Sequence, residues 1–152
     1  MCVVHRLSLI CAVCWCLAAC STTPTLSPFE SDGCSLFPDR SLVSKQDWCD
    51  CCFAHDLAYW RGGTEEERLA ADQTFKACIL EMTQDKPLAE LMYRGVRIGG
   101  SAYFPTWYRW GYGWNYRSAR GRSYQPLSTE QSAQADVLQR QYFDSDNQAV
   151  CR

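Results

Sequence analysis

Residues 48–60 read WCDCCFAHDLAYW and combine three cysteines with the pair His55-Asp56. Asp47 lies directly before this stretch, and aspartate is a residue type that commonly caps the start of a helix. Gly62-Gly63 follows it, and glycine commonly ends a helix. We therefore expect a helix over about residues 48–60, with Asp47 as its N-cap.

A second helix is predicted a few residues further on. Thr64 and Glu67 have the spacing of a capping box, and Glu65 and Glu66 suit the positive end of the helix dipole. This helix is expected to run to about Thr83. Two helices joined by so short a turn lie antiparallel, so residues that face each other have position numbers with a nearly constant sum.

The rest of the chain carries weaker signals. Asp85-Lys86-Pro87 predicts the start of a short helix over about residues 88–97, and a last helix is expected over about residues 129–142. Residues 32–46 and 103–124 have no clear period, and no strand pattern or internal repeat is present. With 152 residues, 47% of them hydrophobic, the chain can form one domain. We expect an all-α fold built on the two antiparallel helices, with an irregular, aromatic-rich C-terminal part.

The N-terminus has the pattern of an export signal. Arg6 precedes the apolar run of residues 7–17, which is too short to span a bilayer as a stable anchor. The run ends in Leu17-Ala18-Ala19-Cys20, which resembles the lipobox of bacterial lipoproteins, in which the cysteine is acylated. An ordinary signal peptide cut near Ala19 is the alternative.

This pattern predicts the organisation of the chain. We expect residues 1–19 to be a lipoprotein signal peptide, residues 20–31 a flexible tether and residues 32–152 the folded domain. An acylated Cys20 would anchor the exported protein in the cell envelope, at the outer membrane in a Gram-negative organism.

The chain contains 11 cysteines. Four leave with the signal peptide and Cys20 is the acylation site, so the domain keeps Cys34, Cys49, Cys51, Cys52, Cys78 and Cys151. An even number in a small exported domain indicates three disulfides, whose pairing the spacing alone leaves open. A zinc site is the alternative, because three of these cysteines lie just before His55, although adjacent cysteines chelate one tetrahedral ion poorly.

His55 is the only histidine that remains once the signal peptide is removed. A general base that works near neutral pH must therefore be His55 or a strongly perturbed carboxylate. Asp56 follows directly, but adjacent helical residues point about 100° apart. Asp56 therefore cannot orient the imidazole, and it is available to bind a cation. Asp72 on the second helix can orient His55 instead.

Residues 51–56 read CCFAHD and resemble the CCxxHD signature of secreted phospholipase A2. Tyr59 lies where that family has a tyrosine that supports the catalytic aspartate. Asp72 precedes Cys78 by six residues, as in the family's second helix. Residues 32–35, which read DGCS, lie upstream, where the family places its calcium loop.

The resemblance covers roughly residues 32–80 and implies a small phospholipase A2-like fold stapled by disulfides. It implies the pairs Cys34–Cys52 and Cys51–Cys78, which leaves Cys49–Cys151 as the third. The family has one further pair, but this chain has Ala58 and Ala71 at the two positions. Because both cysteines are missing together, the departure supports the alignment.

The antiparallel register of the first two helices agrees with this alignment. Each implied facing pair has nearly the same sum of position numbers: Cys51 with Cys78, His55 with Asp72, and Ala58 with Ala71. One register therefore accommodates all three pairs.

In the mechanism that the resemblance implies, His55 takes a proton from a water molecule that attacks the ester carbonyl of a lipid. Asp72 and Tyr59 are the further catalytic residues: Asp72 holds His55, and Tyr59 supports Asp72. Calcium neutralises the phosphate and the developing oxyanion. Its implied ligands are the carboxylate of Asp56 and the backbone carbonyls of Gly33, Ser35 and Phe37.

Two features depart from the family. Residues 34–39 read CSLFPD, whereas the family's calcium loop is rich in glycine, whose conformations backbone ligation often needs. The family's N-terminal helix has no counterpart, because Pro24 and Pro28 interrupt the segment before the domain. We expect either a calcium-dependent enzyme that hydrolyses an acyl ester of a glycerophospholipid, or a catalytically silent lipoprotein of the same fold that binds lipid or a partner protein.

Charged and aromatic residues are unevenly distributed. Residues 30–90 contain 13 acidic and 6 basic residues, whereas residues 91–129 contain 6 arginines and no acid. Ten aromatic residues lie between Tyr93 and Tyr124. Such a segment fits contact with a phospholipid membrane surface, or the core of a small domain with arginines stacked on the rings. The net charge of −2 and the expected export argue against nucleic acid as a partner.

Overall fold

The computed structural model describes residues 25–103, 111–117, 123–145 and 150–151. These residues form four α-helices: α1 (Cys49–Arg61), α2 (Glu65–Thr83), α3 (Lys86–Gly99) and α4 (Thr129–Asp144). The two-residue strands β1 (Thr25–Leu26) and β2 (Tyr116–Arg117) form one short antiparallel pair. The described chain is thus helical, as predicted, and the strand pair is the element that no sequence pattern indicated.

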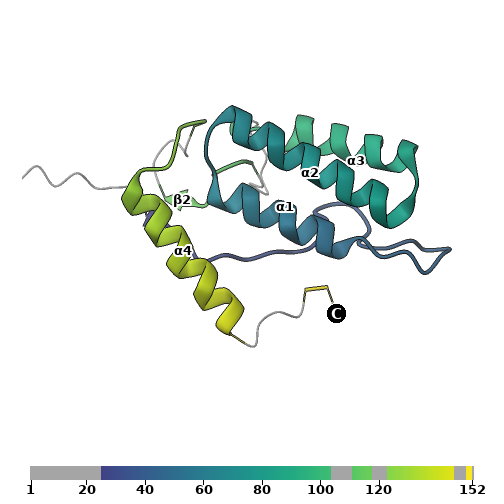
Figure 1. Ribbon diagram of the computed structural model, residues 1–152, viewed down its shortest axis with the longest axis horizontal. Coiled ribbons are helices and arrows are strands. Elements are labelled where there is room, and N and C mark those ends of the chain that lie inside the picture. The colour runs from purple at the N-terminus through teal and green to yellow at the C-terminus, as the bar shows by residue number, and fades with distance from the viewer. Residues whose placement is uncertain (1–24, 104–110, 118–122, 146–149, 152) are drawn as a thin grey trace, which may run out of the picture.

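The helices α1, α2 and α3 alternate in direction and lie side by side, with α2 packed against both of its neighbours (Figure 1). The antiparallel pairing expected for the first two helices is confirmed. Helix α4 lies on the other side of α1 and contacts β1. Among the helices of the described residues, none combines the length and the apolar character needed to cross a bilayer.

Side-chain caps explain where α2 begins, but not where α1 begins. Thr64 and Glu67 exchange the two hydrogen bonds of the predicted capping box. At the start of α1, Trp48 occupies the cap position and its side chain makes no capping bond. Asp47, expected to be the cap, lies one residue earlier, and its carboxylate accepts from the N–H of Cys49 at 2.9 Å. Asp47 therefore satisfies a backbone donor of the first turn from outside the helix.

Two apolar clusters lie on opposite sides of α1. The first, between α1, α2, α3 and the loop before α1, contains Cys34, Trp48, Cys51, Cys52, Phe75, Ile79, Ala89 and Met92. The second, between α1, α4 and the strand pair, contains Leu26, Phe29, Trp60, Tyr116 and Ala135. Because α1 is covered on two sides, it joins the two halves of the domain.

Three disulfides staple the domain: Cys34–Cys52, Cys49–Cys151 and Cys51–Cys78. They are the same pairs that the resemblance implies. Because all six cysteines are paired in disulfides, none of them is available as a zinc ligand. The zinc alternative is therefore wrong.

The expected boundary between tether and domain at residue 31 is wrong. Leu26 and Phe29 are 2% and 4% exposed, and Phe29 packs against rings of both α1 and α4. The indole N–H of Trp60 also donates to the carbonyl of Ser27 at 2.8 Å. The folded domain therefore includes residues 25–31, because two apolar side chains anchor this segment to the helices. The expected signal peptide, Cys20 and residues 21–24 lie outside the described residues.

Candidate active site

His55 on α1 and Asp72 on α2 face each other across the helix pair. The imidazole Nε2 lies 2.8 Å from Oδ1 of Asp72, and the two side chains are 7% and 0% exposed. One helical turn before His55, the Cys51–Cys78 disulfide joins the same two helices. The register that brings the histidine to the carboxylate is therefore held covalently.

Tyr59 lies one turn after His55 on α1 and contacts the same carboxylate. Its hydroxyl donates to Oδ1 of Asp72 at 2.7 Å, and its ring centroid lies 4.0 Å from that of His55. Phe75 packs against the imidazole from α2, with ring centroids 4.7 Å apart. Burial and then the charge of Asp72 raise the pKa of Tyr59, so its hydroxyl stays protonated and donates.

Two arginines that sequence reasoning missed complete the surroundings of Asp72. Arg97 on α3 donates from Nη1 to Oδ2 of Asp72 at 2.6 Å. Arg68 on α2 is 3% exposed, and its Nε lies 3.7 Å from the same oxygen and donates to the Tyr59 hydroxyl at 3.1 Å. The i, i+4 spacing of Arg68 and Asp72 is a signal that could have been read. No local signal could place Arg97 here, because it comes from a third helix.

These contacts decide the charge of Asp72. Burial alone would raise the pKa of this carboxyl, but hydrogen bonds from His55, Tyr59 and Arg97 outweigh burial and hold the pKa below its ordinary value. Asp72 is therefore a carboxylate at neutral pH, with donors on both oxygens. A carboxylate in this position orients the imidazole and stabilises a positive charge on it.

The second ring nitrogen of His55, Nδ1, has no hydrogen-bond partner among the described residues. His55 lines a pocket with a volume of about 350 Å³, which is within the range of small-molecule clefts. Because Asp72 carries no proton, Nε2 must hold the hydrogen of the neutral imidazole, and Nδ1 is then an acceptor. A water molecule or a ligand in the pocket can therefore donate to Nδ1.

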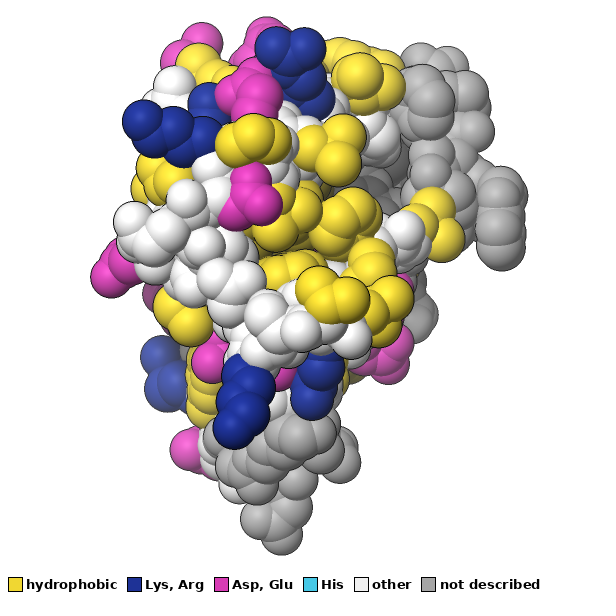
Figure 2. Space-filling view, turned by 90° about the vertical axis from the view of Figure 1, so that its right-hand side faces the viewer, with side chains coloured by type: hydrophobic (Ala, Val, Ile, Leu, Met, Phe, Trp, Pro, Cys, Tyr) yellow, Lys and Arg dark blue, Asp and Glu magenta, His cyan; other side chains and the backbone are white. Residues whose placement is uncertain are grey.

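The pocket lies between the loop before α1 and the helices α1, α2 and α3. Its ionisable lining residues are His55, Asp56 and Tyr59. Its apolar lining comes from the loop, α2 and α3, and includes Leu36, Phe37, Phe75, Leu91, Met92 and Val96. Leu36 and Leu91 are 80% and 60% exposed, so the apolar lining continues onto the surface. Figure 2, which looks onto the end of the molecule where α1 and α3 begin, shows hydrophobic side chains gathered on this face.

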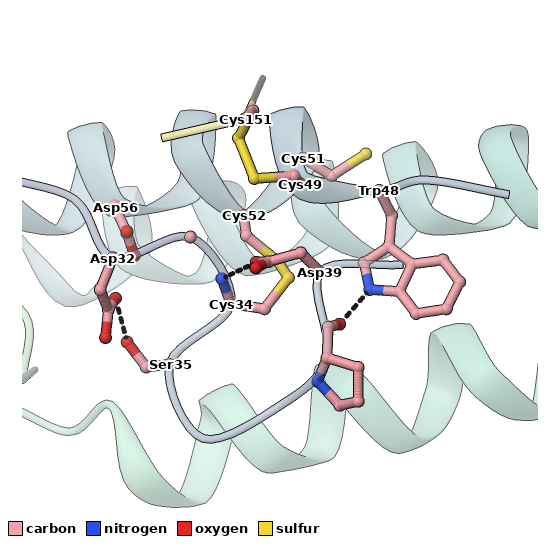
Figure 3. The surroundings of a disulfide bond; sticks show 12 residues. Asp32, Cys34, Ser35, Asp39, Trp48, Cys49, Cys51, Cys52, Asp56 and Cys151 are labelled. Carbon is pink, nitrogen blue, oxygen red and sulfur yellow. Dashed lines mark hydrogen bonds between the residues drawn. A yellow bond between two sulfur atoms is a disulfide. The ribbon is translucent and has the colours of Figure 1, made fainter. Parts of the chain in front are cut away.

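Asp56 extends toward the loop before α1 and lines the same pocket (Figure 3). Its Oδ2 accepts a hydrogen bond from the Ser31 hydroxyl at 2.6 Å. Burial raises the pKa of Asp56, the Ser31 hydroxyl lowers it, and the charges of Asp32 and Asp39 raise it, so that the pKa is about 7. No cationic side chain of the described residues pairs with Asp56. A partly buried carboxylate near two others favours a cation as its partner.

The loop of residues 33–39 is attached to α1 by the Cys34–Cys52 disulfide (Figure 3). The Asp39 carboxylate closes the loop by accepting from the N–H of Cys34 at 2.7 Å. Gly33 has a φ of 77°, and a Cβ there would collide with Asp39, so this position requires glycine. Leu36 has a φ of 58°, so its backbone is left-handed although the residue is not glycine.

Among the described residues, no group of three or more His, Cys, Asp or Glu side chains lies close enough to hold a metal ion. The calcium ligands that the resemblance implies include one carboxylate only, that of Asp56, and the others are backbone carbonyls. Asp56 and the three residues with implied carbonyl ligands, Gly33, Ser35 and Phe37, all line the pocket. These donors are all oxygen, the donor type that calcium takes. Ligation of an ion by them stays a prediction.

Two tyrosines of the aromatic and arginine segment belong to the core. Tyr112 and Tyr116 are 3% and 1% exposed. Tyr112 packs edge-on against Tyr59, with ring centroids 5.2 Å apart, and the Tyr124 hydroxyl accepts from Arg68 at 2.7 Å. Of the two interpretations, core filling therefore holds for Tyr112 and Tyr116, whereas Tyr103 is 67% exposed. Residues 104–110, which include two tryptophans, lie outside the described residues.

Comparison with known proteins identifies no relative. No family model matches the chain, and no curated protein or solved structure matches it either. The function must therefore be inferred from the arrangement of the chain's own residues.

Proposed function

We propose that this protein has a phospholipase A2-like fold and hydrolyses an acyl ester of a glycerophospholipid, with calcium, at a membrane surface. The observation that carries the proposal is the arrangement of His55. Asp72 holds one ring nitrogen, and the other has no partner among the described residues and belongs to an apolar pocket. An oriented general base beside an apolar pocket is what hydrolysis of a lipid ester needs.

In the proposed reaction, a water molecule in the pocket donates a hydrogen bond to Nδ1 of His55. His55 takes this proton while the water oxygen attacks the ester carbonyl, so no acyl-enzyme forms. Asp72 stabilises the imidazolium, and Tyr59 and Arg97 hold Asp72 in place. The proton then passes to the leaving alcohol oxygen, which restores the neutral imidazole.

Asp56, together with the backbone carbonyls of Gly33, Ser35 and Phe37, would hold the calcium ion. The fit rests on Asp56, a partly buried carboxylate with a raised pKa and no cationic partner among the described residues. Bound calcium would supply positive charge to the substrate phosphate and to the oxyanion that forms.

The membrane as a partner is supported by the apolar surface around the pocket. Leu36 and Leu91 line the pocket and are largely exposed, so a lipid could enter from a bilayer with its chain against protein. Exposed apolar groups of this kind mark membrane or ligand contact. We further propose that the protein is exported and that an acylated Cys20 keeps the domain at the envelope membrane.

Release of fatty acid from mixed phospholipid vesicles tests the proposal. The wild-type protein should release fatty acid with calcium and should stop when a chelator is added. His55→Gln should lower the rate by about 10²–10⁴-fold, because a general base contributes this much. Asp50→Asn, on the exposed side of α1, should leave the rate unchanged. No release by either wild type or His55→Gln would contradict the proposal.

A catalytically silent lipoprotein of the same fold, which binds lipid or a partner protein, is the second candidate. It is favoured by Leu36 at a left-handed loop position and by Ser31, which already occupies one oxygen of Asp56. In that case, calorimetry should detect no calcium binding, the protein should still bind vesicles, and wild type and His55→Gln should release equally little fatty acid.

A further inference from the structure

Two glycines of α3 line the pocket at positions where the fold would allow a side chain. Gly95 and Gly99 lie four residues apart and therefore on one face of the helix. Apart from the chain neighbours and the backbone of α3 itself, a Cβ at either position would meet no atom of the described residues within 4 Å. Neither glycine has a positive φ. The fold therefore does not require glycine at these two positions.

Gly100, the next residue, differs from them. A Cβ at Gly100 would collide with the ring of Tyr59, so packing requires glycine there. Glycine inside a helix is less stable than alanine, so Gly95 weakens α3 with no packing reason. Gly95 and Gly99 therefore leave open space at the pocket.

The space beside these glycines is lined by apolar side chains, and the imidazole of His55 lines the same pocket. Leu91, Met92 and Val96 come from the same helix, which contributes no charged residue to the pocket. His55 is 8% exposed and lines the pocket, with no partner for Nδ1 among the described residues. An occupant must therefore combine an apolar chain with a polar group that reaches His55.

We propose that one acyl chain of the substrate lies along α3 beside Gly95 and Gly99, and that these two glycines are specificity-determining residues that set the size of the chain. The identity of the chain as part of a phospholipid rests on the proposed function. A side chain at position 95 would lean toward the start of α3, over Leu91 and Met92, and would fill this space. Between Leu91 and Gly99 the helix rises by about 12 Å, which gives the chain an extended apolar wall.

Thermal unfolding of the full-length, disulfide-bonded protein separates a spacing role from a packing role. Gly95→Ala should raise Tm by roughly 2–4 °C, because alanine stabilises a helix interior. Gly100→Ala should lower Tm, because its methyl group meets Tyr59. A lower Tm for Gly95→Ala would show that this glycine is structural and would overturn the inference.

Titration calorimetry with octanoate and dodecanoate, below their micelle concentrations, tests the chain itself. The wild-type protein should bind dodecanoate more tightly, and Gly95→Leu should weaken dodecanoate binding at least tenfold and remove the preference. Arg94→Leu adds the same side chain on the exposed surface of α3, outside the pocket lining, and should change neither affinity. Gly95→Ala should weaken dodecanoate binding by a smaller factor, which keeps the test valid where Gly95→Leu does not fold. Unchanged binding in the Gly95 variants, or no binding by the wild type, would overturn the inference.

The vesicle assay distinguishes failure of this inference from failure of the proposed function. If the protein binds dodecanoate in a way that depends on Gly95 but releases no fatty acid, the proposed hydrolysis is contradicted and the acyl-chain site is supported. Fatty acid release with the same rate and chain preference in wild type and Gly95→Leu would support hydrolysis and overturn the role of the glycines.

Discussion

The two aspartates of the site lie in opposite electrostatic surroundings. Asp72 is fully buried, accepts hydrogen bonds from three side chains, and has a pKa below its ordinary value. Asp56 is partly exposed, accepts from the Ser31 hydroxyl, and has a pKa raised to about 7 by burial and by two neighbouring carboxylates. Asp72 accepts a hydrogen bond from His55, and Asp56 is the next residue after His55 on α1.

The protein itself balances the charge of Asp72, whereas it leaves the charge of Asp56 for a ligand to balance. The negative charge of Asp72 is balanced by Arg97 and Arg68, so its position is set by the protein alone. The charge of Asp56 has no such counterpart among the described residues. Because an unpaired, partly buried charge is unfavourable, this side of the pocket gains stability when Asp56 binds a proton or a cation.

Asp72→Asn should have the largest effect on both stability and hydrolysis. It removes the carboxylate that Arg97 and Arg68 share and gives His55 a neutral partner. Loss of one member of a buried charge pair costs about 3–5 kcal/mol, and the rate should fall by about 10³-fold or more. Urea unfolding and the vesicle assay measure the two effects.

Asp136→Asn is the matched control for this substitution. Asp136 also pairs with an arginine, Arg61, but both side chains are about a third to a half exposed, at 32% and 48%, and such pairs contribute little. Equal losses of stability in the two variants would contradict the special position of Asp72.

When calcium is absent, Asp56→Asn should raise the stability of the protein, whereas Asp72→Asn lowers it. The pKa of Asp56 is about 7 in the folded protein and 3.8 without these surroundings, so between these values the folded state holds a proton that the unfolded state has lost. The free energy of unfolding therefore falls as pH rises from about 4 to about 7, by at most about 4 kcal/mol. Asp56→Asn removes this decline and should be more stable than wild type at pH 8.

Urea unfolding in chelator at pH 5 and pH 8 measures this difference. Calcium at pH 8 should then stabilise the wild type and leave Asp56→Asn unchanged, because only the wild type offers a carboxylate. A variant that is less stable than wild type at pH 8 in chelator would show that Asp56 is paired within the protein.

The parts of the molecule that could be predicted from the sequence depend on short-range signals. The capping box of Thr64 and Glu67 lies within four consecutive residues, and it marks the start of α2. His55 and Asp72 come together because the two adjoining helices have one register that also fits the cysteines. A local cap and one hairpin thus suffice to place the base and its aspartate.

The parts that could not be predicted depend on contacts between distant segments. Arg97 reaches Asp72 from α3, and no spacing within the first two helices indicates this. Leu26 and Phe29 are two apolar residues among prolines and small polar residues, which is also the pattern of a linker. Their burial depends on α4 and on β2, which follow about 90 residues or more later in the chain. The direction of loop carbonyls depends on φ and ψ at single residues such as Leu36, which residue type alone does not determine.

Arg97→Gln should have an intermediate effect and tests the side of Asp72 that faces α3. It removes a charged hydrogen bond to a buried carboxylate, but Arg97 itself is 26% exposed, so we expect a cost of about 1–2 kcal/mol. The vesicle rate should fall by about tenfold, since Asp72 loses a positioning contact. Arg94→Gln, on the same helix and paired with Glu90 at the surface, should change neither quantity. Equal behaviour of the two variants would mean that Arg97 does not position Asp72.

Ser31→Ala should have the smallest effect and tests the side of Asp56. The hydroxyl lowers the pKa of Asp56, so its loss should raise that pKa further and destabilise mainly the ionised form. In chelator, the cost should therefore be about 0.5–1.5 kcal/mol at pH 8 and should decrease toward pH 5, where the carboxyl is protonated. Ser44→Ala, which removes a hydroxyl that donates to exposed Gln46, should cost nothing at either pH. A cost that is equal at both pH values would instead mean that Ser31 stabilises the fold through its other contact, the N–H of Gly33. The segment that was expected to be a tether would then have no influence on the ionisation of Asp56.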